Sequence, residues 1–500
     1  MRLSECNRFN FRVLVLLFVF LMLFPLVSCV KNKTEGTTSA SETTWVPEPV
    51  APELICTIQT EGFDGPVSTY TTVQKTYLAD KAKNATNYAA GKQELSRPLP
   101  VTLRWDVVFT AGRSSLRYFI VRIWTKADRS DAREYIVGRT EREFKFVNPF
   151  IGQQYYWDVT AVGADGGTVT SNTNTFQTED RSFRFIYVDG ITNVRDLGGK
   201  MTEDGGRIRQ GLLYRGAELH KEGSIVLVTD DGLRALRLLG IQSELDFRTK
   251  DEAGVRATSV IGKGVYYFFR TLSGSKDFTS SECKSSLKKI FTVLSDEKNY
   301  PIYLHCMVGT DRTGLVCWLV NGLCGVSEDD LWRDYLFSNF ATIGDGRKPS
   351  KIENNYVDKL QATQGEPYQK KVYNYLKDVV GIPAQQLDAV IRIMKAEPGT
   401  SAENAAPVIS GKHTHSPESA YTVVSEPTCS SPGIRVRYCL LCGGFVPGSI
   451  DETPTVEKAH LVENWTVTVP PTLTTDGNRQ GTCVECGAKL DETFSVPVYS

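Results

Sequence analysis

The hydrophobic pattern of this chain changes its period along the sequence, and that change constrains the fold more than any other feature. From about residue 53 to 180, short runs such as 101–105, 118–123 and 155–162 alternate apolar and polar residues, which is typical of half-buried strands. From about 183 to 396, apolar strands alternate with helical patterns, which is typical of an α/β layer fold. We therefore predict an all-β sandwich followed by an α/β domain with a central sheet flanked by helices.

The composition supports a multidomain protein and excludes several classes. A chain of 500 residues is long enough for roughly two to four domains. A hydrophobic fraction of 41% allows packed cores and excludes a wholly disordered chain. The net charge of -1 gives no indication of a nucleic-acid partner. Twelve cysteines are too few for a disulfide scaffold, although five of them lie between Cys429 and Cys486.

The first 28 residues have the pattern of a secretory signal peptide. Arginines precede an uncharged apolar run at 13–26, which is too short to cross a membrane comfortably. The run ends in Leu-Val-Ser-Cys, which resembles the lipobox of bacterial lipoproteins. That resemblance implies lipidation of Cys29 and an extracytoplasmic protein, lipid-anchored to the bacterial cell membrane; the alternative is a plain signal peptide with an incidental cysteine. Residues 29–52, rich in Thr, Ser, Glu and Pro, are predicted to form a stalk linker.

Aromatic residues between 53 and 180 indicate what kind of sandwich to expect. The run 149–159 resembles the corner and following strand of a fibronectin type III domain. The resemblance implies that Tyr155 is the corner tyrosine and Trp105 the core tryptophan of an early strand. We expect these aromatic side chains to lie in the core, and the module to be a spacer or a weak binding surface.

One segment of the α/β region contains the residues that indicate a chemical function. Residues 303–314 read Tyr-Leu-His-Cys-Met-Val-Gly-Thr-Asp-Arg-Thr-Gly. A predicted strand ends at Cys306, five residues follow, and an apolar helix begins near Arg312. The backbone N–H groups of this loop are expected to curl toward the helix N-terminus and to form an anion site sized for a phosphate. The predicted phosphate-binding residues are Met307, Val308, Gly309, Thr310 and Arg312.

The side chains around this loop predict a cysteine nucleophile. The positive field at a helix start favours the thiolate of Cys306, and the planar fork of Arg312 can bind two phosphate oxygens. Thr313 can donate its hydroxyl to the sulfur, and His305 can orient the loop through its ring. The implied reaction is attack of sulfur on phosphorus, with a phosphocysteine that water then hydrolyses. This chemistry needs no cofactor.

The loop resembles the Cys-x5-Arg signature of the protein tyrosine phosphatase superfamily. More narrowly, it resembles the bacterial and fungal form that reads His-Cys-x-x-Gly-Lys-Asp-Arg-Thr-Gly. Four further motifs match that narrower family in order, at residues 193–199, 209–215, 245–248 and 334–339. The resemblance covers 183–396 and implies a tyrosine phosphatase-like catalytic domain. Its expected partner is a phosphorylated protein, through phosphotyrosine, or a small phosphomonoester.

The rival interpretation is a non-catalytic protein that binds phosphorylated ligands or acts in adhesion at the surface. Such proteins usually lose the cysteine or the arginine of the loop, and both are present here as Cys306 and Arg312.

A leaving phenolate or alkoxide needs a proton from a nearby general acid. In the narrower family an Asp inside the loop has this role, which the resemblance assigns to Asp311. Asp246 is the second candidate, unless it only forms an ion pair with Arg248. Arg195 and Asp196 are expected to line or brace the pocket, or merely to shape the Gly-Gly turn that follows them.

One loop position departs from the family pattern. The family's lysine, which adds charge for substrates with extra phosphates such as phosphoinositides, is replaced by Thr310. We therefore expect a plain phosphomonoester substrate rather than an inositol lipid.

The segment 413–500, after a linker at 397–412, is predicted to be a duplicated small module. Pro, Gly, Cys, Cys and Gly recur at an offset of 44 residues. The two Cys-x-x-Cys-Gly units, at 439–443 and 483–487, have the form of zinc knuckles. They resemble repeats found near the ends of secreted bacterial surface proteins.

The two repeats of this segment do not contain the same set of candidate metal ligands. In the first repeat, Cys439 and Cys442 are expected to bind structural zinc together with Cys429 and one histidine, His413 or His415. The second repeat has Leu473 where the first has Cys429. Its remaining candidates are Cys483, Cys486 and His460. Disulfides, or a module without metal, are the alternatives.

Overall fold

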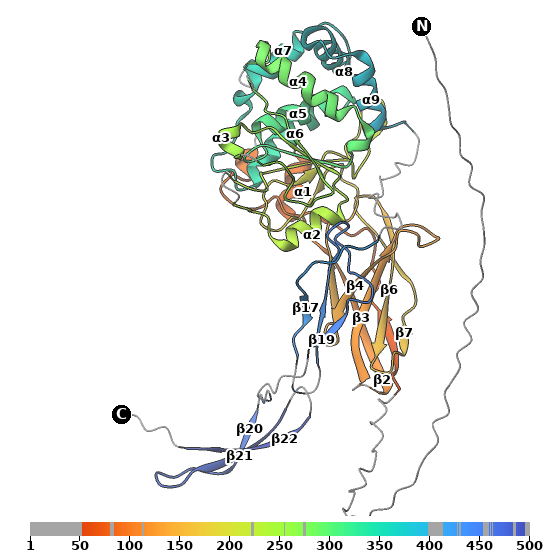
Figure 1. Cartoon of the computed structure of the whole chain (residues 1–500), viewed down its shortest axis with the longest axis vertical. Helices are drawn as coiled ribbons and strands as arrows, with labels where there is room; N and C mark the ends of the chain where they lie inside the picture. Colours follow the sequence, from red (N-terminus) through yellow and green to blue (C-terminus); the bar gives the residue numbers. More distant parts are fainter. Residues whose placement is uncertain are drawn as a thin grey trace, which may run out of the picture. The chain divides into compact units, whose positions relative to one another are not determined.

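The computed structural model describes most of the chain beyond residue 52 (Figure 1). The described residues are 53–80, 85–112, 115–221, 225–254, 256–273, 277–398, 414–427, 429, 432–453, 460, 462, 464–483 and 487–495. The predicted signal peptide, Cys29, the stalk, His413 and Cys486 lie outside them. None of the described helices is both long enough and apolar enough to span a membrane.

Two antiparallel sheets form the region predicted to be a sandwich. One sheet has the order β1-β2-β5 and the other β4-β3-β6-β7, with β8 paired to β6. The bounds are β1 Ile55–Thr60, β2 Val101–Ala111, β3 Leu116–Trp124, β4 Arg133–Gly138, β5 Glu143–Phe146, β6 Gln154–Gly163, β7 Thr168–Thr170 and β8 Asn174–Gln177. The runs of period two at 101–105, 118–123 and 155–162 therefore lie in β2, β3 and β6, as predicted.

Aromatic side chains fill the space between these two sheets. Trp105 and Trp157 are buried, and Trp105 packs edge-on against Phe119. Tyr155 stacks on Phe176, and its hydroxyl accepts a hydrogen bond of 2.7 Å from the backbone N–H of Phe150. The hydroxyl of Tyr155 thus bonds to backbone a few residues upstream, which is the geometry of a tyrosine corner.

The region from 53 to 180 is not purely β, and here the expectation was wrong. Helix α1, Thr72–Ala79, and a short 3-10 turn lie between β1 and β2. Thr71 caps α1 with a capping box completed by Gln74, a local signal that the period-two pattern of the flanking strands obscured. The insertion packs on the α/β domain, where the hydroxyl of Tyr77 donates to the carbonyl oxygen of Arg333 at 2.9 Å.

The α/β domain is built on a mixed sheet of six strands in the order β14-β13-β15-β12-β10-β9. Strands β12, β13, β14 and β15 are parallel, and β9 and β10 are antiparallel. The bounds are β9 Arg184–Phe185, β10 Arg195–Asp196, β12 Leu213–Gly216, β13 Ser243–Asp246, β14 Tyr266–Phe269 and β15 Ile302–His305. A separate two-stranded sheet pairs β11, Arg207–Ile208, with β16, Lys395–Ala396.

Successive side chains of each strand point to opposite faces of this sheet, and helices cover the apolar side chains on both faces. Leu213, Ile302 and Leu304 join the core formed with α4, α5, α6, α8 and α9, several of which Figure 1 shows grouped together. Tyr214 and Tyr303 face the other core, which contains Leu236 of α2. The helices are α2 Asp230–Leu238, α3 Lys250–Ala253, α4 Ser281–Leu294, α5 Asp311–Leu323, α6 Glu328–Phe337, α7 Asp358–Gln361, α8 Tyr368–Asn374 and α9 Ala384–Met394. This is the flanked central sheet that the sequence predicted.

The tail contains two antiparallel sheets of three strands each. The first has the order β17-β18-β19 and the second β20-β21-β22. Their bounds are β17 Thr422–Ser425, β18 Gly433–Val436, β19 Asp451–Thr453, β20 Trp465–Val469, β21 Gly477–Thr482 and β22 Lys489–Phe494. Arg435 lies over the ring of Tyr421, and Arg479 lies over that of Trp465, with 4.5 Å to the ring centroid in both cases. The same contact therefore occurs at equivalent positions 44 residues apart.

Candidate active site

Cys306 lies where the central parallel strand meets the longest apolar helix of the domain. Strand β15 ends at His305, and α5 begins at Asp311. The carboxyl ends of β12 and β13 flank this point because both strands run parallel to β15. Open α/β sheets bind ligands at the carboxyl ends of their strands, so the loop predicted from the sequence occupies the usual place for a site.

Three carbonyl groups of the loop accept hydrogen bonds from residues outside the loop. The oxygen of Met307 accepts from the backbone N–H of Glu218 at 2.9 Å, and that of Val308 accepts from the amide of Asn193 at 2.8 Å. The guanidinium of Arg215 donates to the oxygen of Gly309 at 2.7 Å. Hydrogen bonds to these carbonyls fix the conformation of the loop, on which the predicted anion nest depends.

The start of α5 leaves donors available to a ligand. Thr310 occupies the N-cap position but provides no side-chain cap to the helix, and the first N–H groups of a helix have no partner within it. Gly309 has φ +69°, and a Cβ there would lie 2.2 Å from the carbonyl oxygen of Gly216, so only glycine fits. The hydroxyl of Thr313 is buried and finds no hydrogen-bond partner among the described residues.

Arg312 is aligned by a carboxylate that the sequence reasoning missed. Its two terminal nitrogens donate to the two oxygens of Glu252 at 2.6 and 2.9 Å. Through this bond the guanidinium lowers the pKa of Glu252 below its ordinary value. Glu252 binds the edge of the guanidinium that Nη1 and Nη2 form. The other edge, formed by Nε and Nη2, is therefore the one suited to a phosphate. A local signal existed, since Glu252 completes a capping box with Thr249 at the start of α3.

Asp311 is bound by two residues from other elements. The guanidinium of Arg347 donates to both of its oxygens, with the shortest contacts at 3.0 Å, and the hydroxyl of Tyr335 donates at 3.2 Å. The Asp311 side chain remains 39% exposed, which leaves it accessible to a bound substrate. Arg347 lies in a loop after α6 and had no recognisable local signal.

Asp246 forms an ion pair with Arg248, which was the alternative to a role as general acid. It is buried and accepts from the backbone N–H, the Nε and the Nη2 of Arg248, the last at 2.7 Å. Burial alone would raise its pKa, but His305 and Arg248 outweigh burial and keep that pKa well below its ordinary value. A carboxylate kept ionised in this way is poorly suited to donate a proton.

His305 fixes the residue next to the nucleophile. Its Nδ1 donates to the carbonyl oxygen of Cys306 at 3.1 Å, and its Nε2 lies 3.0 Å from the carboxylate of Glu244. Burial opposes the charged ring, but Asp246 and Glu244 together raise the pKa of His305 above its ordinary value. The predicted orienting role of His305 therefore has a hydrogen-bonded basis.

Arg195 and Asp196 are almost fully buried, and their side chains make different contacts. Arg195 donates to the carboxylate of Asp334 at 3.0 Å, and Arg215 donates to the other oxygen of that carboxylate at 2.5 Å. Lys200 lies 3.5 Å from the same group. Asp196 pairs with Arg184 at 2.9 Å and accepts from two backbone N–H groups. Arg195 also donates to Asn193, which binds the loop at Val308, so its contacts match bracing. Asp196 accepts from Gly198 of the Gly-Gly turn, so its contacts match the turn-shaping alternative.

The side chain of Thr310 is buried beneath the loop rather than directed to solvent. Its hydroxyl lies 3.3 Å from the amide of Asn193 and 3.4 Å from the oxygen of Val308. The position that carries lysine in the family pattern therefore contributes no charge here.

Burial keeps the cysteines of the surrounding core unreactive. It raises the pKa of Cys283 and of Cys317 to about 11, and that of Cys324 to about 12. Thiols with such pKa values remain protonated at neutral pH and are poor nucleophiles.

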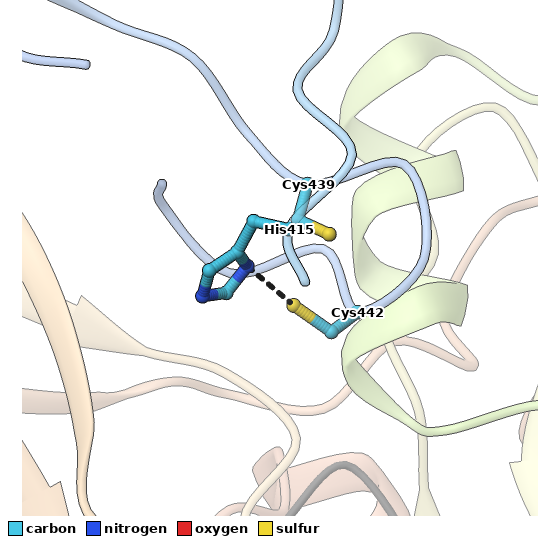
Figure 2. A group of neighbouring side chains, drawn as sticks. All are labelled: His415, Cys439 and Cys442. Atoms are coloured by element: carbon cyan, nitrogen blue, oxygen red, sulfur yellow. Dashed lines mark hydrogen bonds between the residues drawn. The ribbon is translucent and has the colours of Figure 1, made fainter. Parts of the chain in front are cut away.

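The tail brings its candidate ligands together in two groups, which differ from the grouping expected from the sequence. The first contains His415, Cys439 and Cys442, shown in Figure 2, and the second contains Cys429, His460 and Cys483. Cys429 therefore lies with the second Cys-x-x-Cys unit rather than with the unit of its own repeat.

Comparisons with known proteins match the α/β domain. Residues 186–404 match the model of the tyrosine phosphatase family. A protein of Cupriavidus necator named "Putative tyrosine-protein phosphatase" is 26% identical over 174 residues, an alignment that covers 30% of this chain. The chain spans 62% of that relative's length. The family match and the relative together support a phosphatase hydrolase, carried by residues 186–404.

Proposed function

We propose that this protein hydrolyses phosphomonoesters, phosphotyrosine among them, through a phosphocysteine formed on Cys306. The observation that carries the proposal is the loop itself. Its carbonyls accept hydrogen bonds from Asn193, Arg215 and Glu218, and Cys306, directly after β15, is followed by the uncapped start of α5. An anion bound there would meet the sulfur and the N–H groups together.

The reaction proceeds in two displacements at phosphorus. The thiolate of Cys306 attacks, an S–P bond forms, and the ester P–O bond breaks as the leaving oxygen takes a proton from Asp311. Water then attacks the phosphocysteine, gives its proton to Asp311, and releases inorganic phosphate and the thiolate. Arg312, aligned by Glu252, binds two equatorial oxygens throughout.

Asp311 is the proposed general acid because of its accessibility and position. It lies in the first turn of α5, beside Arg312, whereas Asp246 is buried in its ion pair with Arg248. Arg347 and Tyr335 fix the Asp311 carboxylate and act as positioning residues. The hydroxyl of Thr313, buried without a partner among the described residues, is proposed to donate to the sulfur.

The proposed substrate is a plain phosphomonoester on a protein or a small molecule. A buried Thr310 adds no positive charge for a second phosphate, so inositol lipids bearing several phosphates are disfavoured. On the lipobox resemblance at Cys29 we propose that the protein is held outside the cytoplasm by a lipid anchor. The sandwich, with the corner contact of Tyr155, would act as a fibronectin type III-like spacer.

The decisive experiment compares hydrolysis of a small aryl phosphate by the chain from residue 30 onward and by its Cys306→Ser variant. A fragment limited to 183–396 is unsuitable because the inserted helix α1 packs on the domain from outside that range. We expect the variant to lose more than about 10⁴-fold in kcat while it retains its melting temperature. Equal rates for the two proteins would refute catalysis and favour the phospholigand-binding alternative.

A further inference from the structure

The two Cys-x-x-Cys turns of the tail share one backbone hydrogen-bond pattern. In the first turn, Cys439 N–H donates to the oxygen of Gly444 at 2.8 Å, and Gly443 N–H donates to the oxygen of Cys439 at 2.9 Å. In the second, Cys483 and Gly487 repeat both bonds at 2.9 Å, the acceptors being Ala488 and Cys483. The backbone N–H of Leu441 also points at the sulfur of Cys439, 3.4 Å away. Turns of this form present sulfur atoms to a metal.

Each turn is completed by ligands that are distant in the sequence. In both groups, the candidate ligand atoms lie within 4.8 Å of one another. Sulfurs at about 2.3 Å from a tetrahedral zinc ion are about 3.8 Å apart, and a sulfur and an imidazole nitrogen are about 3.5 Å apart. The sulfurs of Cys429 and Cys483 are 3.8 Å apart, and Cys442 Sγ lies 3.9 Å from Nδ1 of His415. A disulfide would bring two sulfurs to about 2.05 Å.

The second group draws on both repeats, which explains an asymmetry in the sequence. Leu473, the counterpart of Cys429 in the second repeat, is 93% exposed and contributes nothing to the group. Cys429 of the first repeat lies beside Cys483 and His460 instead. The second group therefore contains a cysteine from each repeat.

The first group lies against the α/β domain. A Cβ on Gly443, which has φ +70°, would be 2.6 Å from the carbonyl oxygen of Arg234 in α2. Arg237 of the same helix donates to Glu418 at 3.1 Å, and Arg234 lies over the ring of Tyr438. Ile434 and Val436 of this repeat pack on Ile136 of the sandwich. The turn that would bind metal is therefore also the surface that docks on α2.

We propose that the tail binds two structural zinc ions, one at His415, Cys439 and Cys442 and one at Cys429, His460 and Cys483. The second ion joins the two repeats because Cys429 crosses from the first repeat to the second. Cysteine and histidine ligands in buried turns favour zinc among the common biological cations. The first sheet buries Ile434 and Val436 against Ile136, whereas the strands of the second are largely exposed. A bound ion would stabilise both, since sheets of this size are marginal alone.

The test is zinc content per chain, measured by plasma mass spectrometry on the protein from residue 30 onward purified with zinc present. We expect two equivalents in the parent, and one in a Cys439→Ser/Cys442→Ser variant. Cys429→Ser should weaken only the second centre, by more than about 100-fold in chelator competition. Cys429→His, which keeps a ligand, should recover part of that loss. Cys56→Ser, a cysteine of the sandwich outside both groups, is the matched control and should retain both ions.

Pairwise variants decide whether Cys429 crosses between the repeats. Cys429→Ser combined with Cys483→Ser should lose no more zinc than Cys483→Ser alone, whereas Cys429→Ser combined with Cys439→Ser should lose both ions. The reverse pattern would overturn the crossing. A metal-free parent whose unreduced mass is two hydrogens lower, with Cys429 linked to Cys483, would overturn the zinc centres in favour of a disulfide. Turnover of aryl phosphate, measured in parallel, reports separately on Cys306.

Discussion

The loop at Cys306 and the tail turns both place cysteines in tight turns that contain a glycine at positive φ, yet they are stabilised by different means. The loop carbonyls are bound by Asn193 and Arg215, and Arg215 is itself fixed by the buried Asp334. The turn at Cys439–Gly443 is closed mainly by its own backbone. A cysteine that must meet a substrate in a fixed geometry needs a rigid scaffold, and residues from the whole domain can supply it. A cysteine that binds an ion can rely on the ion for rigidity.

The largest expected effect comes from removing the charge at the base of the catalytic scaffold. Asp334→Asn leaves the cations Arg195, Arg215 and Lys200 buried without their shared carboxylate. Burial and the neighbouring Arg215 already lower the pKa of Arg195 to about 10. We expect the free energy of unfolding to fall by about 3–5 kcal/mol, measured by denaturant titration.

The matched control is Asp330→Asn on the same helix. Asp330 pairs with Arg333 where both side chains are partly exposed, so the expected loss is about 0.2–1 kcal/mol. Similar losses for the two variants would show that the buried cluster does not carry the scaffold and would remove the contrast with the tail.

The next effect separates chemistry from scaffolding within the loop. Asp311→Asn removes the proposed proton donor but leaves Cys306 and Arg312 in place. We expect turnover of an alkyl phosphate to fall on the order of 10²-fold. An activated aryl phosphate, whose leaving group needs no proton, should be affected much less. Steady-state kinetics on the two substrates measure the split, with Asp345→Asn as the control near the same arginine. An equal loss on both substrates would assign the acid role elsewhere.

The smallest effect concerns the alignment of the phosphate-binding arginine. Glu252→Gln keeps the shape of the side chain but replaces one of the two oxygens that accept from Arg312 with an NH2 group, which cannot accept a hydrogen bond. A loss of about 1.5 kcal/mol, the lower value for a hydrogen bond to a charged group, corresponds to a fall of about 10-fold in kcat/KM. Asp251→Asn, its exposed neighbour on α3, should leave kcat/KM unchanged. If Glu252→Gln behaves like Asp251→Asn, Arg312 is aligned by the loop alone.

Local sequence predicted the elements well where one signal dominated. The strand expected to end at Cys306 is β15, which ends at His305, and the helix expected near Arg312 is α5, which begins at Asp311. The capping box of α1 was equally local, but it lies between two strands of strong period-two pattern and was missed. Competing signals of different period, rather than the lack of a signal, account for that error.

The sequence by itself predicted the loop at Cys306 as an anion site, because a strand end, a glycine and a helix start fall within 12 consecutive residues. Only the tertiary structure decided which charges meet. It placed Glu252 against Arg312 and Arg347 against Asp311, and it brought Cys429 close to Cys483. The physical reason is that each of these contacts joins residues from different parts of the chain. For Asp246, the structure selected the ion pair with Arg248, one of the two roles expected from the sequence. Periodicity and spacing describe single elements, whereas electrostatic and metal-ligand partners are chosen by how the elements pack.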